Sequence, residues 1–271
     1  DDYRAYVGGT SGLIYGYVND GFYTVADFES FDSKSRTWKL KEGVVDSSPL
    51  SDTPRPGNAK FKKLTPVDPN STNPYQLTEA DRTVIGNTTP KFSGGFGLNA
   101  TYKGFDMSMF FNFMYDFDVL NANKIMLTTW ADNKENNFLM DIASDKRWRN
   151  FDDMGNEIRY SPEVLAEFNK NATMWNPTSI GRPICMSYAV EDGSFLRLNS
   201  ATLGYTLPSV WTKKVGLSKV RFYVSGNNLF TLTGYSGYDP EVNIATGLTP
   251  NIDYNRYPRS RTYTFGAQLT F

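Results

Sequence analysis

The sequence contains no histidine, and this absence limits the chemistry that the chain can support. Histidine is the commonest metal ligand and a frequent general base, and a Ser–His or Cys–His catalytic device requires it. The single cysteine, Cys185, allows no intrachain disulfide, and we interpret it as a loop thiol without a catalytic role. The carboxylate pair Asp152–Asp153 shows no sign of a shared pocket. We therefore expect that the protein is not an enzyme.

A strong net charge and long apolar runs are also missing. The formal net charge of −1 indicates neither a nucleic-acid partner nor an anionic membrane surface. No apolar run reaches the length of about 18 residues that a spanning helix needs. Barrel strands are short and alternate apolar with polar residues, so they remain possible. An aromatic content of 15%, with 22 glycines, is typical of a β protein.

What the sequence does contain is strict alternation of apolar and polar residues. In the segment RTYTFGAQLTF (261–271), every second residue is apolar, which predicts a strand with one apolar and one polar face. Similar patterns recur upstream, and each is long enough to cross a bilayer at a tilt. We predict five strands, over residues 92–102, 105–118, 194–206, 219–234 and 260–271.

The connections between these strands are of two kinds. The turn at Lys103–Gly104 and the segment 207–218 are short, whereas 119–193 and 235–259 are long, and a further irregular stretch, 19–90, precedes the first strand. Structureless loops of this length are unusual in compact soluble domains. Short turns on one side and long loops on the other are typical of outer-membrane barrels.

Local signals refine this picture at three places. The stretch SPEVLAEFNK predicts a short helix with Ser161 as its N-cap and Pro162 at its first position. A change of phase predicts a β-bulge near Ser200–Ala201. The segment GLIYGYV (12–18) is either a sixth spanning strand or part of the outer loop, and we favour the loop.

Amphipathic strands also occur half-buried in soluble sandwiches, so the apolar faces need a second criterion. Phe and Met follow one another on the apolar face over 105–117, and the chain ends on an aromatic residue, as outer-membrane barrels do. Five aromatic residues are also predicted at one rim, as an interfacial girdle requires: Tyr102, Phe105, Tyr205, Trp211 and Phe271. These features favour lipid over a protein core.

Four blocks carry a resemblance to a known family. They read ADRTVIGNTTPKFSGGFGLNATYKGFDMSMFF, YAVEDGSFLRLNSATLGYTLP, VRFYVSGNNLFTLTGYSGYDPEV and YPRSRTYTFGAQLTF. In this order they resemble the C-terminal part of the SusC/RagA family of TonB-dependent outer-membrane transporters, from about Pro56 to Phe271. The resemblance implies an all-β chain that forms the C-terminal five or six antiparallel strands of a large, 22-stranded transmembrane β-barrel with long extracellular loops.

The resemblance also divides the chain into spanning and outer parts. It implies spanning strands within 91–118, 194–234 and 260–271, and extracellular loops over 19–90 and 119–193. The family's plug domain and TonB box are absent from these residues. Because an open sheet edge in lipid costs several kcal/mol for each unpaired backbone group, we expect the chain to be part of a larger barrel.

The function implied by the resemblance is the import of large nutrients across the outer membrane of a Gram-negative, Bacteroidota-type bacterium. Glycan oligosaccharides are the family's commoner cargo, and peptides are the alternative. The implied partners are a SusD-like surface lipoprotein that acts as a lid, the TonB complex, the rest of the barrel and outer-membrane lipid; no nucleic acid is expected. Two other hypotheses remain: a secreted or surface β-sandwich that binds carbohydrate, and a barrel with a structural or adhesive role.

Two groups of residues are candidates for contact with cargo or lid. Three tryptophans in the 119–193 loop could stack on sugar rings or pack against the lid, or could form the loop's own core. Four polar residues are predicted on the inner wall, where they would touch cargo or the plug. These candidates are Trp130, Trp148, Trp175, Asn112, Arg221, Tyr223 and Asn227.

A calcium site is a weaker candidate. Family members often carry an EF-hand-like run before the DRTVIG block, and here the stretch reads VDPNSTNPYQLTEADRTVIG. Asp68 and Asn70 keep the spacing of the first ligands, and Glu79 and Asp81 could contribute. The third acid and the turn glycine that calcium loops use are missing, so a solvated acidic loop is the favoured interpretation. No other cofactor is expected.

Overall fold

The computed structural model describes residues 2–51, 53–129, 137–242, 247 and 249–271. The chain divides into two compact units, and each is described by itself. Unit 1 comprises Asp1–Gly86 and Leu120–Val190, and unit 2 comprises Asn87–Val119 and Glu191–Phe271. Among the helices of the described residues, none has the length and apolar character needed to cross a membrane.

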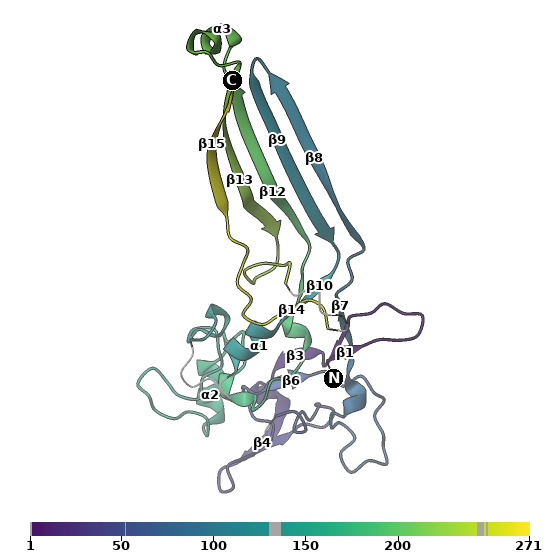
Figure 1. Cartoon of the computed structure of the whole chain (residues 1–271). Helices are drawn as coiled ribbons and strands as arrows, with labels where there is room; N and C mark the ends of the chain where they lie inside the picture. Colours follow the sequence, from purple (N-terminus) through teal and green to yellow (C-terminus); the bar gives the residue numbers. More distant parts are fainter. Residues whose placement is uncertain (1, 52, 130–136, 243–246, 248) are drawn as a thin grey trace. The chain divides into compact units, whose positions relative to one another are not determined.

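Unit 2 is built on a five-stranded sheet in the order β15-β13-β12-β9-β8, with every neighbouring pair antiparallel (Figure 1). The strands are β8 (Phe92–Tyr102), β9 (Phe105–Tyr115), β12 (Phe195–Thr206), β13 (Lys219–Thr233) and β15 (Thr262–Thr270). All five predicted strands therefore form within a few residues of their expected positions.

The largest difference from prediction is at the end of β9. The strand expected to run to residue 118 ends at Tyr115, because Asp116 adopts a left-handed conformation with a φ of +58°. The chain then enters β10 (Asp118–Asn121), which pairs with β11 (Val190–Asp192) and β14 (Ile252–Asp253) in a separate three-stranded sheet.

The two short connections of the sheet use different local structures. In the β8–β9 hairpin, Lys103 and Gly104 both have positive φ, the combination that a two-residue type I′ turn requires. The β12–β13 connection contains α3 (Ser209–Thr212) and the 3-10 helix η6 (Lys213–Val215), which ends at Gly216 with a φ of +75°. Glycine tolerates this conformation without steric cost.

The predicted bulge lies between Leu198 and Ser200, where the register of β12 shifts against both of its neighbours. The shift changes the phase of the alternation, so that Leu198 and Leu203 share one face of the sheet although their positions differ by an odd number. The phase change in the sequence was therefore a correct signal of the bulge, within two residues of its position.

Unit 1 contains short strands and helices rather than one large sheet. Its sheets are β1-β2-β7, β3-β6 and β4-β5. The strands are β1 (Tyr3–Arg4), β2 (Leu13–Gly16), β3 (Asn19–Phe22), β4 (Phe28–Asp32), β5 (Thr37–Leu40), β6 (Ala59–Phe61) and β7 (Thr83–Asn87), the last of which ends just beyond the unit boundary. Segment 12–18 thus contributes β2, which pairs with β1 and β7 and not with the five-stranded sheet.

The helices of unit 1 are short. The predicted helix forms as α2 (Pro162–Phe168), with Ser161 as N-cap and Pro162 at its first position. The others are α1 (Ala122–Thr128) and the 3-10 helices η1 (Val25–Asp27), η2 (Glu79–Asp81), η3 (Met140–Ile142), η4 (Pro177–Ser179) and η5 (Ser187–Ala189).

Unit 1 has its own hydrophobic core, which corrects the expectation of irregular loops. One cluster of buried side chains surrounds Phe61 and Trp175, and a second surrounds Trp148 and Leu165. Each cluster joins residues from segments more than 80 positions apart in the sequence, so no local periodicity announces them. The long connections 19–90 and 119–193 therefore fold together as a compact body.

Candidate functional site

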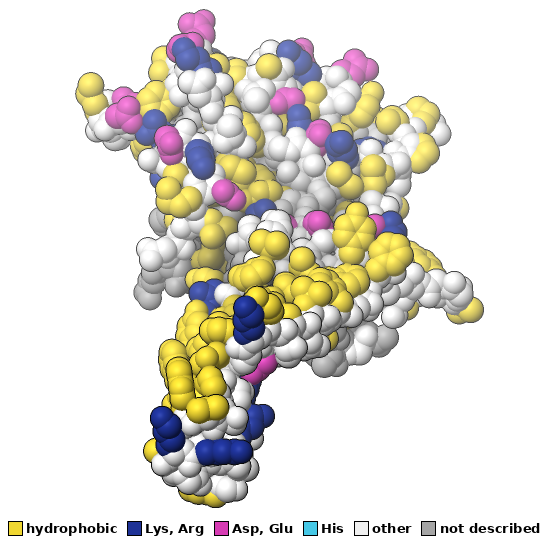
Figure 2. Space-filling view, turned by 90° about the horizontal axis from the view of Figure 1, so that it is seen from above, with side chains coloured by type: hydrophobic (Ala, Val, Ile, Leu, Met, Phe, Trp, Pro, Cys, Tyr) yellow, Lys and Arg dark blue, Asp and Glu magenta, His cyan; other side chains and the backbone are white. Residues whose placement is uncertain are grey.

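One face of the five-stranded sheet is apolar and exposed. The registers place Phe96, Phe111 and Leu198 in one row across three strands, with the rings of Phe96 and Phe111 stacked 4.9 Å apart. On β15, Phe265 is 80% exposed. Hydrophobic side chains gather in a band along this side of the sheet, whereas the other side is largely polar (Figure 2). A contiguous apolar surface of this kind marks contact with lipid or with another protein.

Aromatic residues gather at one end of this apolar face. Tyr102, Phe105 and Tyr205 lie in register across β8, β9 and β12, and the ring centroids of Phe105 and Tyr205 are 4.5 Å apart. Trp211 and Phe271 are exposed and lie beyond the same end of the sheet, where α3 and the C-terminus are seen in Figure 1. This arrangement matches the rim of aromatic residues that was predicted from the sequence.

On the polar face, Arg221 of β13 reaches across β12 to Asp106 of β9. Its Nε lies 2.9 Å from Asp106 Oδ1, and a second guanidinium nitrogen contacts the other carboxylate oxygen. Gly204 of β12 lies beneath this ion pair, and a Cβ there would come within 2.4 Å of the guanidinium. Tyr223 lies over Gly266 of β15 in the same way. The two glycines thus make room for side chains that brace the sheet.

The four residues predicted on the inner wall share this polar face. Arg221 and Tyr223 are neighbours on β13, with the guanidinium carbon 5.1 Å from the ring centroid. Asn112 pairs with Arg197 in the sheet register and is half-buried, and its side-chain oxygen has no hydrogen-bond partner among the described residues. Asn227 is exposed. The structure therefore brings Arg221 and Tyr223 together and leaves the two asparagines at other positions of the face.

A buried ion-pair network on unit 2 was not predicted. Arg197, near the start of β12 and 2% exposed, contacts Asp239 Oδ1 at 2.5 Å and Glu241 Oε2 at 3.3 Å. Burial alone would raise the pKa of Asp239, but the Arg197 guanidinium and backbone N–H groups hold it below its usual range. The signal in the sequence was an arginine on the polar phase of a strand and two acids in the YSGYDPE block.

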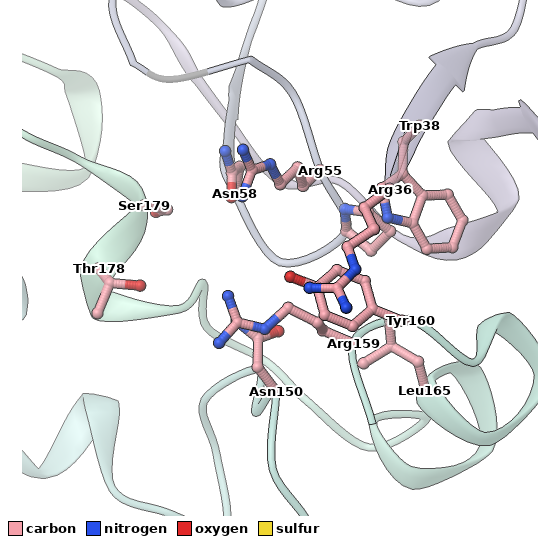
Figure 3. A pocket seen from close by; sticks show the side chains of 11 residues that line it. Arg36, Trp38, Arg55, Asn58, Asn150, Arg159, Tyr160, Leu165, Thr178 and Ser179 are labelled. Carbon is pink, nitrogen blue, oxygen red and sulfur yellow. The ribbon is translucent and has the colours of Figure 1, made fainter. Parts of the chain in front are cut away.

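Unit 1 contains a cleft that is lined by five arginines and whose narrow part is shown in Figure 3. Its narrow part has a volume of about 80 Å³ and is lined by Arg36, Arg55 and Arg159 together with Trp38 and Tyr160. Its wide part, of about 470 Å³, adds Arg147 and Arg149. The two parts share Asn150, Arg159 and Thr178 in their walls, so we describe them as one feature, the arginine cleft.

Three separate segments supply the narrow part of the arginine cleft. Arg36 lies in the β4–β5 turn with a φ of +55°, Arg55 precedes β6, and Arg159 precedes α2. The guanidinium of Arg36 lies 4.8 Å from the ring centroid of Tyr160. Arg159 contacts Glu157, whereas no ion pair of Arg36 or Arg55 occurs among the described residues. Two arginine side chains of this cleft therefore remain available to an anion.

The predicted tryptophans have different positions. Trp130 lies outside the described residues. Trp175, 1% exposed, packs edge-to-face against Tyr188 in the larger apolar cluster, and its indole N–H donates to the carbonyl oxygen of Thr128 at 3.4 Å. Trp148, 2% exposed, packs in the second cluster and also lies in the wall of the wide part of the arginine cleft. The interpretation of these rings as the loop's own core therefore describes both residues.

The calcium candidates do not converge. Asp81 is fully buried and accepts hydrogen bonds from the backbone N–H groups of Leu64, Thr65 and Thr78, so its oxygens are already occupied. Asp68 accepts from the backbone N–H of Asn70, and Glu79 is exposed. Within the described part of the chain, no three acidic, cysteine or histidine side chains are arranged to hold a metal ion.

Cys185 and the Asp152–Asp153 pair show no catalytic arrangement. Burial raises the pKa of Cys185 to about 12, so the thiol stays protonated and is a poor nucleophile. Asp152 accepts hydrogen bonds from Asn156, and Asp153 pairs with Arg149. Both carboxylates therefore have structural partners.

Sequence comparisons find relatives among the TonB-dependent receptors. No protein-family model matches the chain. The chain is 33% identical over 266 residues to the TonB-dependent receptor P3 of Formosa agariphila. The aligned region covers 96% of this chain and 22% of that protein. The chain is 38% identical over 88 residues to the TonB-dependent receptor SusC of Bacteroides thetaiotaomicron, covering 31% of this chain and 8% of that protein. The chain thus spans 22% of the first relative's length and 8% of the second's.

Solved structures share the fold. The RagAB peptide transporter superposes with a TM-score of 0.59 at 22% identity, over 97% of this chain and 23% of that one. The RagAB peptide importer in its open-open state gives 0.55 at 23% identity, over 95% and 22%. The exposed apolar face, its aromatic rim and this likeness in fold are those of a segment of a transmembrane β-barrel. By its sequence relatives, the chain belongs to the SusC/RagA family of TonB-dependent receptors.

Proposed function

We propose that the chain is part of an importer that carries large nutrients across the outer membrane of a Gram-negative bacterium, with energy supplied through TonB. The observation that carries this proposal is the exposed apolar face of the five-stranded sheet, which is as wide as the sheet and faces away from its polar side. In a membrane this face meets hydrocarbon, while the polar side, with Arg221 and Asp106, faces the barrel interior.

The outer-membrane importer would act with partners that these residues do not include. We infer a 22-stranded barrel closed by further strands, a plug, and a SusD-like surface lipoprotein as lid. One solved neighbour is the RagAB peptide transporter. Unit 1, with its own core, is the part of the chain that would meet the lid and cargo outside the membrane. We infer that Asn112, Arg221, Tyr223 and Asn227 line the interior.

We infer glycan oligosaccharides as cargo, with peptides as the second candidate. The solved neighbours are a peptide importer and a peptide transporter, so peptides stay a candidate cargo. The β-sandwich alternative loses its main support, because in a sandwich the Phe and Met rows of β8, β9 and β13 would be covered by a second sheet. Within the described part of the chain, nothing covers them, and several of these side chains are more than 40% exposed.

Fractionation and growth together test this proposal. The protein that carries these residues should remain in outer-membrane pellets after a high-salt wash and be released by detergent. Deleting its gene should abolish growth on one polymeric or peptide nutrient while growth on the corresponding monomer is unchanged. Recovery of the protein in the soluble fraction would refute the importer, and normal growth on every polymer tested would favour an adhesive role.

A further inference from the structure

We propose that the arginine cleft of unit 1 binds acidic oligosaccharides through their carboxylate or sulfate groups. This inference rests on the proposed importer function and names the class of cargo at one of its outer surfaces. It starts from an imbalance of charge. Five arginines line the cleft, and Asp152 is the one acidic residue among the described lining residues.

The partners of these arginines leave part of the positive charge uncompensated. Arg149 is paired with Asp153, and Arg159 contacts Glu157. Arg36 and Arg55 make no ion pair with any described residue and lie together in the narrow part of the cleft (Figure 3). Guanidinium groups present a planar fork of N–H donors that matches carboxylate and sulfate oxygens, and such charged hydrogen bonds are stronger than neutral ones.

The shape of the cleft suits an anionic group attached to a larger body. The narrow part, at about 80 Å³, has room for one such group beside the arginines. The wide part, at about 470 Å³, borders the same wall residues Asn150, Arg159 and Thr178 and has room for the rest of a ligand. A lone inorganic anion would fill the first part and leave the second unused.

The other lining side chains favour a sugar over a peptide. Trp38 and Tyr160 are half-buried in the lining. Phe31 packs against both rings and the Arg36 guanidinium lies over Tyr160, so the exposed part of the Trp38 ring is the apolar surface left for the C–H face of a sugar. Asn150 and Thr178 offer an amide and a hydroxyl group to ring hydroxyls. Trp38 of β5 is the one β-strand residue among the described lining residues, and a single strand residue offers an extended peptide few of the backbone hydrogen bonds by which strand addition gains affinity.

Arg36 provides a further observation. It occupies a turn position with a φ of +55°, which glycine or asparagine adopts at lower cost. The guanidinium that this position supplies points into the cleft beside Tyr160. A residue kept at a strained position often serves function and not stability.

Calorimetry on the protein that carries these residues, purified in detergent, tests the proposal. The probes are oligogalacturonate and its methyl ester for the carboxylate, and a sulfated galactan oligosaccharide and its desulfated form for the sulfate. Hexaglutamate is the peptide probe. We expect at least one acidic sugar to bind about tenfold or more tightly than its neutral counterpart, because charged hydrogen bonds supply the difference. Its affinity should fall with rising salt.

Matched variants assign the binding to the cleft. Arg36→Gln with Arg55→Gln should weaken binding of that acidic sugar about tenfold or more and leave the neutral sugar unchanged. The control variant Lys34→Gln with Lys41→Gln also removes two positive charges, but from exposed positions that do not line the cleft. This control should bind the acidic sugar as tightly as the unaltered protein does.

Each other result overturns the proposal. These results are equal affinity for acidic and neutral sugars, equal losses in the two double variants, an unaffected Arg36→Gln/Arg55→Gln variant, and preference for hexaglutamate. A failure of the importer function would show itself separately, either as recovery of the protein in the soluble fraction or as normal growth on every polymer after gene deletion, whatever the cleft binds. With the importer intact, unchanged binding by the variant refutes the acidic cleft alone.

Discussion

At the scale of single residues, Gly57 shows how closely the two segments of unit 1 approach each other. Its φ is +89°, and a Cβ added there would lie 2.2 Å from Trp148 Cδ1. Its amide donates to the carbonyl oxygen of Tyr23 at 2.7 Å, so the backbone is held in place. Gly57→Ala should therefore destabilise unit 1 by roughly 2–5 kcal/mol, from left-handed strain plus overpacking. Hydrogen exchange of the Trp148 amide reports this local free energy.

Gly43→Ala is the matched control for this substitution. Gly43 has a similar φ of +85°, but nothing lies within 4 Å of the Cβ position. It should cost only the backbone term of roughly 1–2 kcal/mol. Equal losses in the two variants would show that the contact between Gly57 and Trp148 does not contribute.

Asp81 predicts a dependence on pH. Burial would raise the pKa of Asp81, but hydrogen bonds from Thr65, Thr78 and Leu64 outweigh it and hold the pKa well below its usual range. A carboxylate with a depressed folded pKa contributes stability above its unfolded pKa of about 3.9 and loses it as the pH falls. We expect the segment around η2 to become sensitive to protease as the pH falls below about 4.

The variant Asp81→Asn isolates this effect. At neutral pH it should weaken the segment by roughly 1.5–3 kcal/mol, because charged hydrogen bonds become neutral ones. Its difference from the unaltered protein should shrink as the pH falls through the acidic range. A difference that stays constant down to pH 3 would exclude the Asp81 carboxylate as the titrating group. Asp68→Asn, at an exposed position, should leave protease sensitivity unchanged at both pH values.

The sequence predicted single residues well on the sheet and poorly in unit 1. On a strand, the face of a residue follows from its parity, so Asn112, Arg221 and Tyr223 were placed on the polar side by counting alone. The arginine cleft was missed because Arg36 and Arg159 meet only after long loops have folded. Trp148 and Trp175 were recognised as candidate contact residues, but nothing in a loop sequence distinguishes a buried ring from an exposed one.

At the scale of elements, the alternation of β9 predicts opposite effects at adjacent positions. Phe111 lies on the apolar face, stacked on Phe96, and Asn112 lies on the polar face. Phe111→Arg should cost roughly 2–4 kcal/mol if the residue lies near the bilayer midplane, because the charge must leave water for hydrocarbon. Asn112→Arg should cost much less. Heat-modifiable migration on gels measures the folded fraction of each variant.

Similar folded fractions for these two variants would contradict the face assignment. The element boundaries themselves were predictable wherever periodicity and turn chemistry agreed, as at the hairpin of Lys103 and Gly104. They were missed where one residue alone breaks a strand. Asp116 has a left-handed backbone that the continuing apolar pattern through Phe117 and Val119 conceals.

At the scale of the whole molecule, the five-stranded sheet is open. The strands β8 and β15 each have one neighbour among the described residues, so each presents a free edge. Unpaired backbone groups in hydrocarbon cost several kcal/mol each, and a barrel avoids this cost by closing. The relatives that match the chain are several times longer, with 22% of P3 covered, and they have the length to supply the missing strands.

Residues 1–271 expressed alone should therefore fail to form a stable membrane protein. We expect aggregated material that is digested by protease and shows no heat-modifiable band, whereas the same residues within a closed barrel should show one. The reason is that the free edges of β8 and β15 need further strands to pair with. The exposed apolar face likewise needs a covering that lies outside the described residues. A monodisperse, protease-resistant product without detergent would instead mean that the apolar face is covered within the chain, and a soluble carbohydrate-binding protein would then be the better conclusion.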